Sequence, residues 1–139
     1  MVVTYVTEYL KGWIDILDKY DITDSELEIM QVLWKNGGGT LSEITAELDK
    51  IRKRNKNTVK TLIYRLIDKK AVKSKKGSAQ GFVYSAAISE KKYLSKANHS
   101  FLARLYKGNV EKLLMNFVEE KTVSKEELQK LIKFIESEK

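Results

Sequence analysis

The stretch NTVKTLIYRLIDKKAVKSKKGSAQGFVYS, residues 57–85, decides the fold. Its first part has apolar residues at helical spacing: Val59, Leu62, Ile63, Leu66 and Ile67. This spacing predicts a helix with one buried side, and Asn57 is a plausible N-cap for it. Two β-prone segments follow at 71–75 and 82–85, and the segment GSAQG between them has a glycine at each end, which favours a hairpin.

Two further helices are predicted before this stretch. Thr23 with Glu26, and Thr40 with Glu43, have the three-residue spacing of a capping box, which marks the start of a helix. The glycines at 37–39 end the first of these helices, because glycine makes a continued helix entropically expensive. Three short helices followed by a two-stranded hairpin are the order of a winged helix-turn-helix domain, which we place at residues 22–88.

The rest of the chain is predicted to be helical. Ser89, Asn109 and Ser124 each precede an amphipathic segment, and Ser124 forms a third capping box with Glu127. These helices follow a domain that closes its own core, so we expect their apolar stripes to meet a second copy of the chain. The expected dimerisation residues are Leu94, Phe101, Leu105, Leu113, Leu114, Phe117, Leu128, Leu131, Ile132 and Ile135. The alternative is that the three helices fold back onto the winged domain as one monomeric core.

The predicted fold class is therefore mainly α, in three parts. Residues 1–21 form an amphipathic helical extension, since Val3, Val6, Leu10 and Trp13 begin a stripe at helical spacing. Residues 22–88 form the winged helix-turn-helix domain with its small β-hairpin wing. Residues 89–139 form a three-helix dimerisation domain.

Composition excludes several classes of protein. The 139 residues are 42% hydrophobic and 32% charged, which suits a folded domain and not a disordered tail. No cysteine is present, so disulfides, thiolate nucleophiles, Cys-ligated zinc and iron–sulfur clusters are excluded. His99 stands alone, and no nucleophile with a paired base is recognisable, so we expect no enzyme, cofactor or metal site. No signal peptide or membrane span is readable, and we expect a cytoplasmic protein without membrane insertion.

Charge is divided sharply along the chain. Residues 1–49 carry a net charge of −7, residues 50–76 carry +11, and residues 77–139 carry +3. A field this positive, interleaved with Thr58, Thr61 and Tyr64, is typical of a surface that binds nucleic-acid phosphates. The alternative is a solvated, lysine-rich helix face.

In a winged helix-turn-helix domain the third helix lies in the DNA major groove. Thr58 and Thr61 share its exposed face, where a hydroxyl and a methyl group can together contact a base edge and a thymine methyl. Lys60 and Arg65 are expected to hold phosphates. The full set of expected DNA-binding residues is Asn57, Thr58, Lys60, Thr61, Tyr64, Arg65 and, from the wing, Lys75, Lys76 and Gln80.

The sequence resembles the penicillinase-repressor family, which includes BlaI, MecI and the copper-responsive CopY. The resemblance is carried by ITDSELEIM (22–30), Leu33-Trp34, NTVKTLI (57–63), Arg65-Leu66, VYS (83–85), SFL (100–102), Leu113-Leu114 and NFVE (116–119). It implies a homodimeric bacterial repressor of β-lactamase or penicillin-binding-protein genes that binds a palindromic operator.

The resemblance also implies a mode of control. Family members are inactivated when antibiotic signalling, through a membrane sensor-protease, leads to cleavage of an Asn-Phe bond, which here is Asn116–Phe117. The absence of cysteine argues against the copper-responsive branch, because Cu(I) selects thiolates. The chain departs from common family patterns at Gln80, where an arginine often occurs, and at Lys70, which replaces a frequent helix-ending glycine.

Two other functions remain open on sequence grounds. One is a repressor controlled by a ligand or by its abundance instead of proteolysis. The other is a winged-helix module for protein–protein interaction whose basic charge is incidental.

Overall fold

The computed structural model describes residues 21–77 and 81–138. The predicted N-terminal helix and Gln80 lie outside these ranges. The described elements are α2 (Asp24–Asn36), α3 (Leu41–Asp49), α4 (Lys56–Asp68), β1 (Val72–Lys76), β2 (Phe82–Ala86), α5 (Glu90–Tyr106), α6 (Val110–Glu119) and α7 (Lys125–Ser137). The predicted fold class, a winged helix-turn-helix domain followed by three more helices, is confirmed.

The helices begin where local capping chemistry predicts, with one exception. All three capping boxes form at Thr23, Thr40 and Ser124. The hydroxyl of each N-cap accepts a hydrogen bond from the backbone N–H of the glutamate three residues on, and the carboxylate of that glutamate accepts one from the N-cap backbone N–H. The prediction of Asn57 as the N-cap of α4 was wrong. Asn55 takes that place, because its side-chain oxygen accepts from the Asn57 N–H at 2.8 Å.

The hairpin is antiparallel, with Val72 opposite Ala86 and Lys76 opposite Phe82. Both strands end one residue later than predicted. The loop after α2 pairs with β2 through an isolated antiparallel bridge, in which Gly39 and Tyr84 exchange backbone hydrogen bonds of 2.8 and 2.9 Å. Gly38 has a φ of 131°, and a Cβ there would lie 3.0 Å from the Tyr84 carbonyl oxygen. This close approach of two backbones requires glycine at position 38.

The core lies among α2, α3, α4 and the hairpin. Its fully buried members include Ile29, Met30, Leu33, Ile44, Leu48, Val59, Ile63 and Leu66. A buried carboxylate joins two of these helices: Glu26, only 1% exposed, lies 2.7 Å from the Lys69 ammonium at the end of α4. This ion pair fixes the C-terminal end of α4 against the start of α2.

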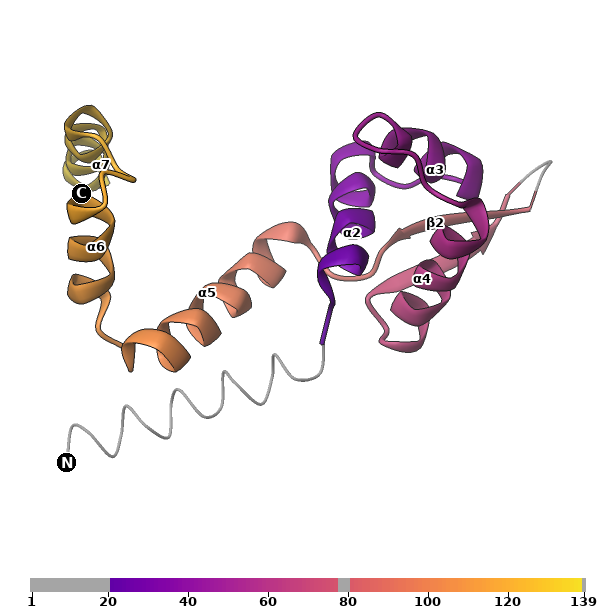
Figure 1. Ribbon diagram of the computed structural model, residues 1–139, viewed down its shortest axis with the longest axis horizontal. Helices are drawn as coiled ribbons and strands as arrows, with labels where there is room; N and C mark the ends of the chain where they lie inside the picture. The colour runs from indigo at the N-terminus through magenta and orange to yellow at the C-terminus, as the bar shows by residue number, and fades with distance from the viewer. Residues whose placement is uncertain (1–20, 78–80, 139) are drawn as a thin grey trace.

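The first turns of α5 are attached to the winged domain. The Trp34 indole N–H donates to the Ile88 carbonyl at 2.9 Å, and the Trp34 and Tyr93 rings lie 5.6 Å apart. From there α5 leads away, and α6 and α7 lie beyond its far end (Figure 1). None of the hydrophobic side chains described in α5, α6 and α7 is buried. In the part of the chain that the structure describes, no helix combines the length and apolar character needed to cross a membrane.

Candidate nucleic-acid interface

The exposed face of α4 carries the predicted reading residues. Asn57, Thr58, Lys60, Thr61, Tyr64 and Arg65 are all exposed, whereas Val59, Leu62, Ile63 and Leu66 on the opposite side are buried in the core. The helix therefore holds the six polar side chains together on one face. The structure brings together the α4 members of the predicted set, as the spacing required.

Contacts within α4 orient two of these side chains. The Thr61 hydroxyl donates to the Asn57 carbonyl at 3.0 Å, so its methyl group and its oxygen lone pairs are the groups available to a ligand. The Lys60 ammonium lies 5.7 Å from the centre of the Tyr64 ring, a cation–π contact between residues one helical turn apart. Both contacts restrict side chains that would otherwise be free on the helix surface.

Not all of the basic segment faces solvent. Arg52 donates to the Glu28 carboxylate on α2 at 3.4 Å, and Arg54 donates to the same carboxylate. The Arg54 side chain is only 12% exposed, and its backbone N–H donates to Asp49 Oδ1 at 2.7 Å. The net charge of residues 50–76 therefore overstates the charge available to a ligand, and the loop before α4 is tied to α2.

The wing supplies a second group of exposed cations. Lys75 and Lys76, both predicted to contact DNA, are exposed on β1. Lys70, at the turn from α4 into β1, has a left-handed φ of 64°, which is the conformation that glycine adopts most easily. The turn therefore forms with lysine in place of the glycine that the resemblance led us to expect.

A hollow of about 390 Å³ lies between the start of α3, α4 and β2. It is lined by Thr40, Leu41, Ser42, Lys56, Lys60, Tyr64, Phe82 and Tyr84. Ser42, Lys56 and Phe82 were not among the predicted site residues. The sequence has no signal that groups these three residues, because they come together only where α3, α4 and β2 meet.

Two tyrosines that line this hollow, Tyr64 and Tyr84, interact with one another. Tyr84 is 6% exposed, and burial, followed by the charge of Tyr64 and a hydrogen bond with its side chain, raises the pKa of the Tyr84 phenol above its usual value. The Tyr64 ring, 48% exposed, is thereby connected to the domain core. Tyr64 therefore interacts both with Lys60 on its own helix and with Tyr84 on β2.

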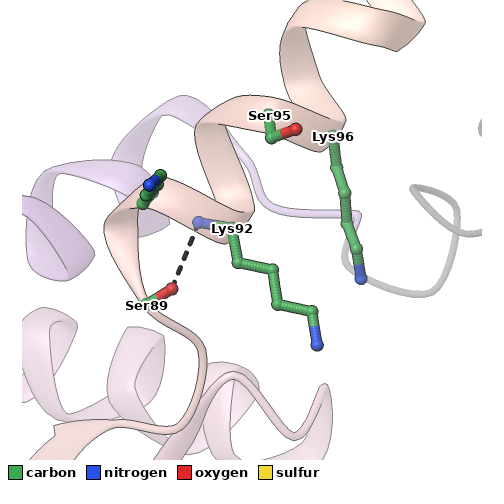
Figure 2. Close-up of a pocket in the computed structure, with 5 residues that line it drawn as sticks. Ser89, Lys92, Ser95 and Lys96 are labelled. Atoms are coloured by element: carbon green, nitrogen blue, oxygen red, sulfur yellow. Dashed lines mark hydrogen bonds between the residues drawn. The ribbon is translucent and has the colours of Figure 1, made fainter.

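A second hollow, of about 350 Å³, is lined by Ser89, Lys91, Lys92, Ser95 and Lys96 at the start of α5. Figure 2 shows the Lys92 and Lys96 side chains extending from α5 toward the same side, with Ser89 capping the helix. The Ser89 hydroxyl accepts from the Lys92 backbone N–H at 3.1 Å. None of these residues lies on α4 or the wing. Among the described residues, no three His, Cys, Asp or Glu side chains are grouped so that they could hold a metal ion.

The predicted dimerisation residues form apolar faces on α5, α6 and α7. Three of them are half-buried: Leu113, Phe117 and Leu128. The other seven are 38–66% exposed: Leu94, Phe101, Leu105, Leu114, Leu131, Ile132 and Ile135. A run of apolar side chains with this much accessible surface is typical of a helix that meets a partner.

The Asn116–Phe117 bond lies within α6. The Asn116 carbonyl accepts from the Glu120 N–H at 3.0 Å, and the Phe117 carbonyl accepts from the Thr122 N–H at 2.9 Å. The Asn116 side chain also donates to the Tyr106 hydroxyl at 3.3 Å. The carbonyl of the Asn116–Phe117 bond is thus in a helical hydrogen bond, and the next carbonyl, that of Phe117, accepts the bond that closes the end of α6.

Residues 22–137 match the family described as Penicillinase repressor. The Penicillinase repressor of Bacillus licheniformis is 36% identical over 118 residues, which cover 85% of this chain and 91% of the relative. The methicillin resistance regulatory protein MecI of Mammaliicoccus sciuri is 30% identical over 112 residues, covering 81% of this chain and 90% of that one.

Among solved structures, Bacillus licheniformis BlaI in its monomeric form, in complex with the blaP half-operator, is similar with a TM-score of 0.46 and 37% identity. The match covers 52% of this chain and 88% of that chain. The family match spans most of the chain, and it agrees with the winged helix and its exposed, basic α4. The chain therefore belongs to the penicillinase repressor family of DNA-binding transcriptional repressors, in its BlaI/MecI branch.

Proposed function

We propose that the protein represses transcription as a homodimer that places two copies of α4 in the major groove of a palindromic operator. The observation that carries this proposal is the face of α4, where six polar or cationic side chains are exposed together above a fully packed core. Dimer symmetry would set the half-sites about one helical turn, or a multiple of it, apart. The regulated genes we propose are those of β-lactam resistance, as the names of the relatives indicate.

In this mechanism the residues of α4 have different tasks. Thr58 and Thr61 read base edges, and the outward methyl of Thr61 suits a thymine methyl. Lys60 and Arg65, with Lys75 and Lys76 on the wing, hold phosphates and set the register without reading sequence.

The test is a DNA-binding titration with two variants on α4. Thr61→Ala should weaken binding to the operator but not to a shuffled duplex, because a base contact is lost. Lys60→Ala should weaken both, and it should lower the slope of log affinity against log salt by about 0.9 for each protomer bound. Thr122→Ala, an exposed threonine between α6 and α7, serves as the control. Unchanged operator affinity in both α4 variants would show that α4 does not read DNA.

We further propose that repression is relieved by cleavage of the Asn116–Phe117 bond after activation of a membrane sensor-protease. A protease needs an extended substrate, so α6 must open locally before the bond can be cut. Cleavage would remove Phe117 and everything after it, including α7 with its apolar stripe. The loss of the dimer would lower operator affinity, because two linked half-sites bind with a high effective concentration.

Incubation of the purified protein with its activated cognate sensor tests this step. The expected products are two fragments whose masses place the cut between residues 116 and 117. An intact bond together with full release from DNA would instead indicate control by a ligand or by abundance.

A further inference from the structure

The hollow between α3, α4 and β2 borders the α4 face that reads DNA, since Lys60 and Tyr64 belong to both. Its other polar members include Ser42, from the first turn of α3, and Lys56, from the first turn of α4 itself. No acidic side chain is among the described residues that line it. A ligand in the hollow would therefore meet ammonium and hydroxyl groups and no carboxylate from the lining.

The hollow is also lined by three aromatic side chains, Tyr64 from α4 and Phe82 and Tyr84 from β2. Phe82 and Tyr84 are two residues apart on β2, so their side chains lie on the same face of the strand. Tyr84 is 6% exposed because the core covers it, whereas Phe82 is 54% exposed. Tyr64 from α4 is 48% exposed beside them. Two large rings on one polar-rimmed surface indicate a contact site for a partner with an apolar part.

Lys56 and Ser42, which contact one another, have the donors that a phosphate requires. The Lys56 ammonium lies 2.9 Å from the Ser42 hydroxyl oxygen, so one of its three N–H groups is used and two remain. The Ser42 hydroxyl hydrogen is also free to rotate toward a ligand, since its oxygen accepts the bond from Lys56. Ammonium and hydroxyl donors beside an apolar ring complement a unit that is anionic at one end and apolar at the other.

We propose that this hollow holds one deoxyribose–phosphate unit of the bound duplex, with the phosphate at Lys56 and Ser42 and the sugar against Phe82. The inference rests on the proposed function and adds a backbone subsite to it. Because Ser42, Lys56 and Phe82 lie on three different elements, the subsite fixes how α4 and the wing sit together on the duplex. Phe82 is a positioning residue, and the contact is independent of base sequence.

The test measures affinity by fluorescence anisotropy on two duplexes, one selected by the protein from a random pool and one shuffled. Phe82→Ala should weaken both by about tenfold for each protomer bound, since about half of a phenylalanine surface loses its contact. Its salt slope should not change, because no cation is lost. Val83→Ala is the matched control: Val83 is the next residue of β2, is 38% exposed, and faces the other side of the strand.

Lys56→Met keeps the apolar stem of the side chain and removes its charge. The salt slope should fall by about 0.9 for each protomer bound, on both duplexes. Lys35→Met, an exposed lysine of α2 outside the hollow, is the control and should leave the slope unchanged.

A second measurement keeps a large aromatic side chain at position 82 and detects the contact directly. Phe82→p-benzoylphenylalanine should crosslink to DNA on irradiation, and Val83→p-benzoylphenylalanine should not. The subsite is overturned if the wild type binds both duplexes but Phe82→Ala binds as tightly, Lys56→Met keeps the full slope, or position 82 gives no crosslink. Failure of the wild type to bind either duplex would instead overturn the proposed function.

Discussion

A single charge in the apolar stripe of α7 should convert the proposed dimer into monomers. Leu131, Ile132 and Ile135 are 54%, 54% and 66% exposed, and they share one side of the helix. Complete burial of such a side chain is worth about 2 kcal/mol, so covering the exposed part gives about 1 kcal/mol for each. In two protomers these three residues together contribute about 6 kcal/mol, and the similarly exposed stripes of α5 and α6 add to this.

Ile132→Glu would remove part of this gain and would place an unpaired carboxylate from each protomer in the interface. Burying such charges without partners costs several kcal/mol, so we expect the dimer dissociation constant to rise by at least about a thousandfold, or about 4 kcal/mol. Gln129→Glu makes the same change of charge on an exposed position of α7 outside the stripe, and it should leave the dimer intact.

Sedimentation velocity from about 1 to about 100 µM distinguishes the outcomes. The wild type and Gln129→Glu should sediment as dimers and Ile132→Glu as a monomer, with helix content by circular dichroism unchanged among the three. A wild type that stays monomeric over this range, or an Ile132→Glu variant that stays dimeric, would refute the assignment of this stripe to an interface.

Two further predictions concern the winged domain itself. Glu26→Gln should lower the free energy of unfolding by about 3 kcal/mol in urea titrations, because it breaks a buried ion pair with Lys69. The control is Glu47→Gln, which breaks the more exposed pair with Lys50. Equal urea midpoints for the two variants would contradict the role of Glu26. The raised pKa of Tyr84 means that the folded chain keeps a proton that the unfolded chain loses above about pH 10, so the melting temperature should fall as the pH rises through this region. Tyr84→Phe should show a smaller fall between about pH 8 and pH 11, and a fall identical to that of the wild type would contradict the assignment.

The helix starts could be predicted because capping is local. Thr40 and Glu43 are three residues apart, and their reciprocal hydrogen bonds depend on little else in the fold. The N-cap of α4 was predicted wrongly because local spacing does not decide it. Asn55 and Asn57 both have a suitable side chain, and the choice between them depends on how the preceding loop is held.

That loop is held by contacts that the sequence could not reveal. Glu28 and Arg54 are 26 residues apart, and nothing in their spacing indicates that one carboxylate pairs with both Arg54, which is 12% exposed, and Arg52, which stays 64% exposed. The Trp34 indole reaches the Ile88 carbonyl, 54 residues away, for the same reason: only the packed domain brings them together.

The candidate site was predictable in its α4 part and not in the rest. Periodicity alone separates the buried face of α4 from the face with Thr58, Thr61 and Tyr64, because residues three and four apart lie on the same face of a helix. The hollow beside it depends on how α3, α4 and β2 meet, so Ser42 and Phe82 could be recognised only in the folded structure.

The most direct test of a dimeric reader of a palindrome is selection of the protein's own binding sites from a random pool of duplexes of about 30 base pairs. We predict enrichment of an inverted repeat whose half-site centres are about 10 base pairs, or a multiple of that, apart. Thr61→Ala should relax the preference at one symmetric pair of positions in that repeat. Recovery of no preferred sequence, or of isolated half-sites without symmetry, would contradict the proposal that a dimer reads a palindrome.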